Sequence, residues 1–156
     1  KPGINFYDVT TLLRDAAALR AAVAAMAAPF GGLGVDLVAG IESRGFILAA
    51  PIAVQLGCGF VPIRKPGKLP AATVRQEYAL EYGTDAVEIH ADAVAAGQQV
   101  LVVDDLLATG GTLAAACQVL ERLGARICGL SLLVELGFLS GRARLEGRRL
   151  EAVIRY

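Results

Sequence analysis

Hydrophobic runs and helix-like segments alternate along most of this chain, separated by glycine, proline or polar breaks. Unbroken apolar runs bounded by turn residues are typical of strands buried on both faces, whereas apolar residues spaced along one face indicate helices. Val87 and Ile89 alternate with polar neighbours, which indicates a further short strand. The expected strands are residues 35–41, 59–63, 100–103, 127–136 and 151–156, and the expected helices are residues 15–28, 46–56, 112–123 and 137–145.

This order predicts an α/β fold, with a mostly parallel twisted sheet flanked by helices on both faces. Ligands of such sheets bind at the carboxyl ends of the strands, where two polar breaks, residues 42–45 and 104–111, are expected. Residues 1–11 are expected to form a loop or short strand. The hydrophobic residues of segment 64–83 have no regular spacing, so we expect a binding loop or lid there. We expect this loop to pair with the strand at Val87 as a hairpin.

The stretch VLVVDDLLATGGT, residues 100–112, carries the most chemistry. A buried strand runs into two carboxylates, Asp104 and Asp105, and then into a loop of small residues at a helix start. Backbone N–H groups at a helix N-terminus bind phosphate without a lysine, and ribose hydroxyls are suitable donors to two acids. The stretch therefore predicts a cradle for a sugar phosphate, and it is not a Walker A loop.

Composition narrows the class of protein further. The chain has 156 residues, 55% hydrophobic and 19% charged, which suits one domain. Fifteen basic residues balance fifteen acidic ones, so no net charge attracts nucleic acid or an anionic membrane. Residues 46–56 are too short to cross a bilayer, and Cys58, Cys117 and Cys128 lack metal-type spacing. We expect a soluble cytoplasmic protein with reduced thiols, and a missing segment before Lys1.

Residues 100–112 resemble the phosphoribosyl-pyrophosphate signature of the type I phosphoribosyltransferases. The segments PGINFYD, AGIESRGF, PIRKPGKLP, LEYGTDAVEIH and SLLVEL are similar, in the same order, to those of the adenine phosphoribosyltransferase family. The resemblance implies one domain over residues 1–156, with residues 1–11 in a base-binding hood and residues 64–90 as the lid region. It implies purine salvage: transfer of the 5-phosphoribosyl group from phosphoribosyl pyrophosphate to adenine, which gives AMP and pyrophosphate. It also implies a homodimer, and Mg²⁺ held through the substrate and water rather than by protein ligands.

The resemblance also assigns roles to residues around the two acids. Asp104 and Asp105 would hold the ribose hydroxyls and act in catalysis, and a cis peptide bond is expected between Glu42 and Ser43. The two acids thus belong to the ribose 5-phosphate site, and the residues expected to bind its 5′-phosphate are Ala108, Thr109, Gly110, Gly111 and Thr112. Those expected to bind pyrophosphate, some of them across a subunit interface, are Ser43, Arg44, Arg64, Lys65 and Lys68.

Two further assignments concern the lid and the base. Glu81 would be the lid carboxylate that approaches the N9 proton of adenine, and Tyr82 would help to close the lid. The residues expected to bind adenine are Ile4, Asn5, Phe6 and Tyr7. Asn5 and Tyr7 depart from the commoner family pattern, in which an aliphatic residue and an arginine stand at these positions.

Several alternatives stay open on sequence grounds. The acceptor could be hypoxanthine, guanine or xanthine, or the chain could be a regulator that senses the donor, although no basic helix-turn-helix is visible. The basic residues at 64–68 could form a solvated turn, Glu81 a surface carboxylate, and Phe6 a core residue. We interpret His90 as a surface residue at a strand end rather than a general base. The arginines at 142, 144, 148 and 149 are interpreted as a solvated face or a subunit contact.

Overall fold

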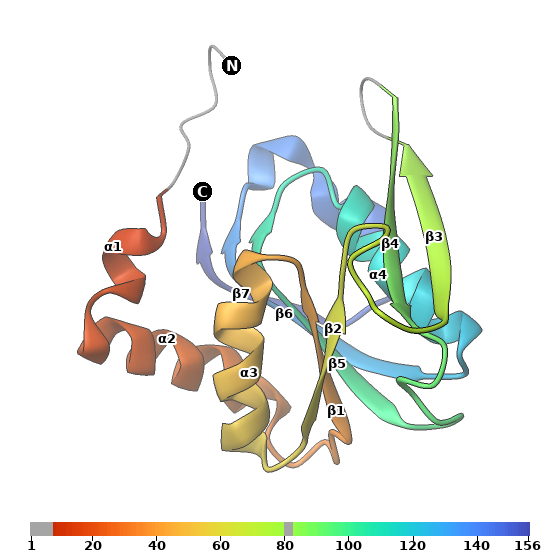
Figure 1. Cartoon of the computed structure of the whole chain (residues 1–156). Coiled ribbons are helices and arrows are strands. Elements are labelled where there is room, and N and C mark those ends of the chain that lie inside the picture. The colour runs from red at the N-terminus through yellow and green to blue at the C-terminus, as the bar shows by residue number, and fades with distance from the viewer. Residues whose placement is uncertain (1–7, 80–82) are drawn as a thin grey trace.

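The computed structural model describes residues 8–79 and 83–156, and its centre is a five-stranded parallel sheet in the order β2-β1-β5-β6-β7 (Figure 1). All four neighbouring pairs are parallel, which confirms the predicted fold class. The strands of this sheet are β1 (Leu37–Ile41), β2 (Gly59–Ile63), β5 (Gln99–Leu107), β6 (Arg126–Glu135) and β7 (Leu150–Arg155).

Helices cover both faces of the sheet, as predicted. In Figure 1, α2 and α3 lie on one face, and α4 lies on the other. Asp15 caps α2 by accepting a hydrogen bond from the Ala18 N–H over 2.7 Å, and Gly57 ends α3 in the left-handed region at φ 71°. The helices are α1 (Thr10–Leu13), α2 (Ala16–Ala27), η1 (Ala28–Phe30), α3 (Arg44–Leu56), α4 (Gly111–Arg122), η2 (Gly137–Leu139) and η3 (Gly141–Leu145).

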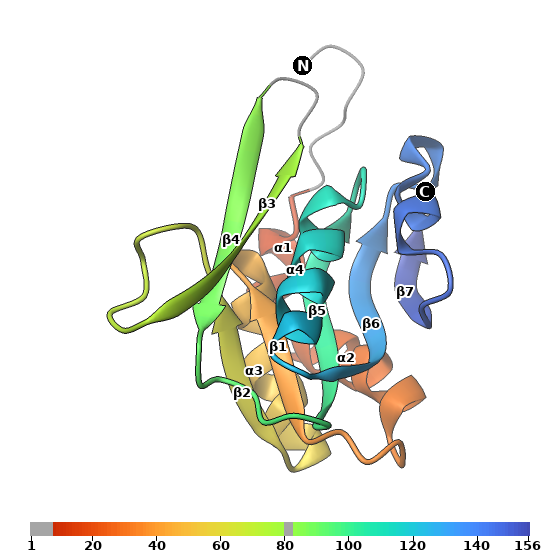
Figure 2. The same ribbon diagram turned by 90° about the vertical axis from the view of Figure 1, so that its right-hand side faces the viewer.

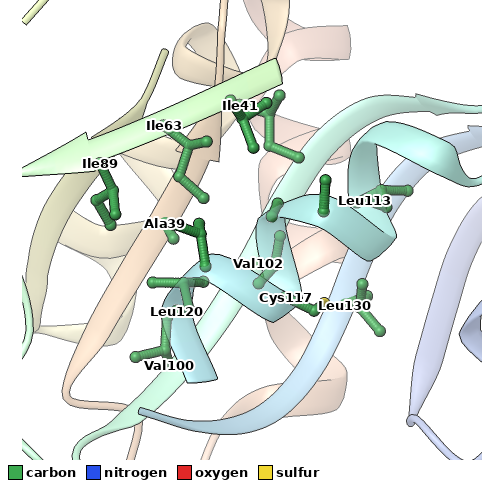
Figure 3. Packing of buried hydrophobic residues seen from close by; sticks show 14 of the residues in the cluster. Ala39, Ile41, Ile63, Ile89, Val100, Val102, Leu113, Cys117, Leu120 and Leu130 are labelled. Atoms are coloured by element: carbon green, nitrogen blue, oxygen red, sulfur yellow. The ribbon is translucent and has the colours of Figure 1, made fainter. Parts of the chain in front are cut away.

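The apolar run of β5 is explained by burial on both faces. Val100 and Val102 pack toward α4, and the alternating Leu101 and Val103 pack in the cluster formed with α2 and α3. Figure 3 shows the first of these layers, where Leu113, Cys117 and Leu120 of α4 lie over residues of the sheet. The two layers hold β5 firmly at the centre of the molecule.

A second, two-stranded sheet consists of the antiparallel strands β3 (Thr73–Ala79) and β4 (Thr84–His90). The hairpin was expected, but residues 73–79 were predicted as part of a loop, and this was wrong because β4 pairs with all seven of them. Figure 2 shows the hairpin extending along α4 and past the edge where β6 ends. Arg122 on α4 fixes this position by donating to the Arg75 carbonyl oxygen over 2.8 Å.

Three local predictions also need correction. Residues 10 and 11 begin a short helix rather than a loop or strand. Helix α2 ends at Ala27 rather than at residue 28, and the chain continues through Pro29 as a 3₁₀ helix, since proline is tolerated in a first turn. Strand β5 extends through both acids to Leu107, because β6 pairs with it as far as Glu135. Within residues 8–79 and 83–156, no helix is long and apolar enough to span a membrane.

Candidate active site

The two acids of β5 lie where the sheet opens. Strand β1 pairs with β5 only as far as Val103, whereas β6 continues alongside as far as Leu107. Asp104 and Asp105 therefore have a strand neighbour on one side and a pocket of about 420 Å³ on the other. The end of one strand pairing thus creates the space into which the sequence places two carboxylates.

Helix α3 supplies one positive charge to this pair. Arg44, at the start of α3, forms an ion pair with Asp105 in which Nε and Oδ2 are 2.7 Å apart, and the Asp105 side chain is only 7% exposed. The next residue, Gly45, allows the helix to approach β5 closely, because a Cβ there would lie 2.9 Å from Asp104 Oδ1. Because two carboxylates share this one guanidinium group, their negative charges are only partly neutralised by α3.

The effect on the pKa is greatest at Asp104. Burial raises its pKa well above the ordinary value of 3.8, and the neighbouring charge of Asp105 raises this pKa further. One hydrogen bond opposes the shift, since the Asp105 N–H donates to Asp104 Oδ1 over 2.9 Å. Hydroxyl donors or a cation placed beside Asp104 would stabilise its ionised form.

The small-residue loop after β5 leads directly into α4. Gly110 has φ 81°, which a side chain would disfavour, and α4 begins at the next residue. Among the described residues, no side chain caps this helix, so its first N–H groups face the loop. A second pocket, of about 90 Å³, is lined by the loop and also by Asp104. This pocket has the backbone donors and the helix polarity that bind a phosphate group.

The phosphate loop is supported from behind by η3. A Cβ on Gly110 would lie 2.5 Å from the Gly141 carbonyl oxygen, so the two segments are in direct contact. Arg142 fixes η3 to β6 through two hydrogen bonds to the buried Glu135, of 3.0 and 2.6 Å. The hydrogen bonds from Arg142 lower the pKa of Glu135, so this pair is charged at neutral pH. The arginine thus has a structural partner, not only a solvated face as predicted.

Basic residues lie on the opposite wall of the larger pocket. Lys65 follows the end of β2 and lines the pocket together with Glu42, Ser43 and Arg44. Although burial would raise the pKa of Glu42, hydrogen bonds from the Lys65 N–H and the Arg64 side chain outweigh it and lower this pKa. Glu42 is therefore an anion that holds the start of the basic segment beside the pocket.

The structure brings most of the sequence-predicted residues to this edge of the sheet. The peptide bond between Glu42 and Ser43 is cis, as predicted. Arg64 and Lys68 lie next to the pocket but do not line it, and Arg64 donates to the Lys68 carbonyl oxygen over 2.9 Å. The predicted site residues that line one or both pockets are Ser43, Arg44, Lys65, Asp104, Asp105, Ala108, Thr109, Gly110, Gly111 and Thr112. The predictions for Ile4, Asn5, Phe6, Tyr7, Glu81 and Tyr82 lie outside the described residues.

Sequence analysis missed two residues of the hairpin. Tyr78 on β3 accepts a hydrogen bond from Thr112 Oγ1 over 3.1 Å, and Asp85 on β4 forms an ion pair with Lys65. Asp85 precedes Val87 by two positions, so the two side chains share one face of the strand. An acid on the apolar face of a predicted strand was a signal in the sequence that could have identified Asp85. His90 lies at the end of β4, as interpreted, but it is half-buried, and its Nε2 atom is buried without a hydrogen-bond partner in the described part of the chain.

A central strand with two acids, a glycine-rich loop at a helix N-terminus and a facing basic wall define a class of proteins that bind sugar phosphates. The chain belongs to the phosphoribosyl transferase domain family, whose model matches residues 10–151. This match covers strands β1 to β6, the phosphate loop and the hairpin, so family and geometry agree.

Within this family, the chain is similar to adenine phosphoribosyltransferases. It is 55% identical over its whole length to that of Desulfitobacterium hafniense, of which it covers 90%. The solved structure from Thermoanaerobacter pseudethanolicus is 50% identical, with a TM-score of 0.97, and the match covers 100% of this chain and 91% of that one. The Saccharomyces cerevisiae structure, complexed with an iminoaltritol bisphosphate and adenine, is 37% identical with a TM-score of 0.91 and coverage of 97% and 88%.

Proposed function

We propose that this protein transfers the 5-phosphoribosyl group from phosphoribosyl pyrophosphate to adenine, giving AMP and pyrophosphate in purine salvage. The observation that carries the proposal is the acid pair of β5, placed between a phosphate-sized pocket and a larger pocket with basic residues. Relatives named adenine phosphoribosyltransferase, at 55–57% identity over nearly the whole chain, support adenine as the acceptor.

The acid pair and the loop would hold the ribose 5-phosphate part of the donor. Backbone N–H groups of residues 108–112 and the Thr109 and Thr112 hydroxyls bind the phosphate, and the α4 N-terminus adds favourable polarity. Asp104 and Asp105 accept hydrogen bonds from the ribose hydroxyls, which offsets the repulsion that raises the pKa of Asp104. Orientation of the ribose relative to both pockets is the main contribution of this wall.

The opposite wall would stabilise the leaving group. As the bond between ribose and pyrophosphate weakens, negative charge builds on pyrophosphate, and fixed cations lower the barrier by binding that charge. Ser43, Arg44 and Lys65 line the pocket where this charge would develop. Arg64 and Lys68, beside the pocket, complete the basic surface. The ribosyl centre has oxocarbenium-like character, so leaving-group stabilisation contributes more than a strong nucleophile.

Magnesium fits the donors that face the pocket. Among residues 8–79 and 83–156, no group of three or more histidine, cysteine or acidic side chains is placed to hold a metal ion. Mg²⁺ loses its water reluctantly, and in phosphate-transfer sites it keeps several waters and binds substrate oxygens. The ion would therefore be held through donor oxygens and water in the pocket that Asp104 and Asp105 line, rather than by protein ligands, and it would supply charge neutralisation at pyrophosphate.

Two segments would complete the site over the substrates. We assign residues 1–11 to the base-binding hood, with Ile4, Asn5, Phe6 and Tyr7 against adenine, and residues 64–90 to the lid region of a single domain. Glu81 in the lid would manage the N9 proton of adenine as the new bond forms, and Tyr82 would help to exclude water. The ordered strands β3 and β4 form the stem of this lid and lead to these residues.

A homodimer in the cytoplasm is the proposed setting. Ile47 and Val54, seven positions apart on α3, share one helix face and are 47% and 82% exposed. An apolar helix face of this kind suits a second copy of the chain. All three cysteines are free thiols, which fits a reducing compartment.

Adenine-dependent release of pyrophosphate tests the proposed function directly. The purified protein is incubated with phosphoribosyl pyrophosphate and Mg²⁺, with adenine or with each of hypoxanthine, guanine and xanthine, and both products are measured. We expect AMP and pyrophosphate in equal amounts with adenine, and little product when Mg²⁺ is removed. Product with another purine but none with adenine would contradict the acceptor assignment, and no product with any base would contradict the enzyme assignment.

A further inference from the structure

Lys65 lines the larger pocket, but its ammonium group is already paired with the lid hairpin. Lys65 Nζ forms an ion pair with Asp85 Oδ2 on β4, and donates a hydrogen bond to Tyr78 Oη on β3 over 2.9 Å. Tyr78 Oη donates to Asp85 Oδ2 over 3.0 Å and accepts from Thr112 Oγ1 over 3.1 Å. One hydroxyl thus connects two pocket residues, Lys65 and Thr112, to an acid outside the pocket lining.

Asp85 differs from the other acids that pair with basic residues here. Asp105 and Glu42, the partners of Arg44 and Arg64, line the pocket themselves, whereas Asp85 comes from the hairpin and does not line it. Its side chain is 32% exposed, so solvent can reach it if Lys65 moves away. No part of the proposed reaction uses Asp85 directly.

The pairing keeps Lys65 charged. Burial would lower the pKa of Lys65, but the hydrogen bonds to Asp85 and Tyr78 and the charge of Asp85 outweigh it, and this pKa is raised. Lys65 is therefore a cation whose charge is balanced before any anion arrives. An incoming pyrophosphate group must take the ammonium from Asp85, and the lost ion pair reduces the net gain in binding.

On the basis of the proposed function, we propose that Asp85 is a positioning residue that competes with pyrophosphate for Lys65. In the free protein Asp85 and Tyr78 hold the ammonium group at the pocket wall, and pyrophosphate takes it over when it binds. The competition weakens pyrophosphate binding and so favours release of this product. Loss of the Asp85 charge should tighten binding, which is the opposite of what structural damage would do.

The test compares pyrophosphate binding by calorimetry, in the presence of Mg²⁺, to the unmodified protein, Asp85→Asn and Glu77→Gln. Asparagine keeps the shape and an acceptor oxygen for Lys65 and Tyr78, and removes only the charge. Glu77→Gln removes one charge from the same hairpin, where Glu77 pairs with the exposed Arg75. We expect Asp85→Asn to bind about two- to fivefold more tightly, the range set by partly exposed ion pairs, and Glu77→Gln to match the unmodified protein. Equal or weaker binding by Asp85→Asn overturns the proposal.

A second comparison shows whether Asp85 acts through Lys65. In a Lys65→Ala background, pyrophosphate binds more weakly and Asp85→Asn should have no further effect. If Asp85→Asn tightened binding equally without Lys65, Asp85 would act by direct repulsion and the positioning role would be wrong. In the unmodified protein, the ¹³C resonance of the Asp85 carboxyl group should shift on addition of pyrophosphate, and an unmoved resonance would also overturn the proposal.

The adenine assay separates this inference from the proposed function. If the unmodified protein forms AMP and binds pyrophosphate but Asp85→Asn does not bind more tightly, only the role of Asp85 is wrong. If the unmodified protein forms no AMP and binds no pyrophosphate, the proposed function fails and the role of Asp85 fails with it.

Discussion

Asp104 lowers the stability of the ligand-free protein because its carboxylate is half-buried and lies beside a second acid. Its folded-state pKa is raised above the ordinary value of 3.8, so the unfolded chain releases this proton at lower pH than the folded chain. Stability therefore falls as the pH rises from 3.8 to the raised pKa, and the penalty is constant above it. The charge that would bind ribose is thus unfavourable for folding.

Asp104→Asn should separate these two effects. The amide removes the ionisable carboxyl group beside Asp105 and can still accept the Asp105 N–H, so we expect a higher melting temperature than the unmodified protein at neutral pH. The difference should vanish below pH 3.8, where the acid is neutral in both states. AMP formation should fall by about tenfold to a hundredfold, as expected for lost charge-assisted hydrogen bonds. Thermal melting across pH and steady-state rates measure both effects. A less stable Asp104→Asn at neutral pH would contradict the burial penalty.

Cys117 should be the least reactive of the three thiols. It is fully buried on α4 in the core between this helix and the sheet, and burial raises its pKa to about 11, whereas Cys58 and Cys128 are half-buried. Thiolates react and thiols do not, so alkylation of the native protein should modify Cys58 and Cys128 first. Mass spectrometry of peptides after timed alkylation measures the order, with the denatured protein as the control in which all three react. Early modification of Cys117 in the native protein would show that α4 separates readily from the sheet.

At the scale of elements, the contact between η3 and the phosphate loop gives a glycine prediction. A Cβ on Gly141 would overlap the Ala108 carbonyl oxygen and lie 2.9 Å from Leu107 Cδ1, so Gly141→Ala must displace the loop. We expect a loss of about 1–3 kcal/mol of stability from overpacking. We also expect a KM for phosphoribosyl pyrophosphate about tenfold higher or more, since misplaced binding groups lose orientation.

Gly31→Ala is the matched control for this change. A Cβ on Gly31 would have its nearest neighbour, the Ala28 carbonyl oxygen, at an ordinary contact distance of 3.6 Å. Its φ of −59° also suits alanine, so stability and KM should stay close to those of the unmodified protein. If both alanine variants behaved alike, η3 would not support the phosphate loop.

Elements with local signals were predictable from sequence. Asp15 marks the start of α2, Gly57 the end of α3, and the apolar runs mark strands that helices cover on both faces. Strand β3 was missed because its residues alternate between exposed and half-buried, and its pairing depends on β4 and on Arg122 of α4. Its stability comes from long-range contacts, which no local pattern records.

The same distinction applies to the candidate site. Residues 100–112 are contiguous, so strand, acids, loop and helix start could be recognised together. The link from Thr112 through Tyr78 to Asp85 joins α4 with both strands of the hairpin, and it exists only once the hairpin docks on α4. The partner of Arg142 was missed for the same reason, since Glu135 lies at the end of a different strand.

At the scale of the whole molecule, the exposed face of α3 predicts how the chain assembles. Val54 is 82% exposed on the face that also carries Ile47, and the proposed homodimer would bury both. Val54→Arg places a charge in that interface, where an unpaired buried charge is strongly unfavourable. We expect Val54→Arg to be a monomer by light scattering after size exclusion, at concentrations where the unmodified protein is a dimer.

Leu33→Arg is the control for this prediction, since Leu33 is a large apolar residue that is 40% exposed in the turn before β1 and is not part of α3. Its substitution adds the same charge and should leave the dimer intact. Neither variant changes a buried residue, so both monomers should be about as stable as the unmodified monomer. Any difference in melting temperature should come from the stabilisation that association adds. A dimeric Val54→Arg would mean that the two copies meet through another surface, and a monomeric unmodified protein would contradict the homodimer itself.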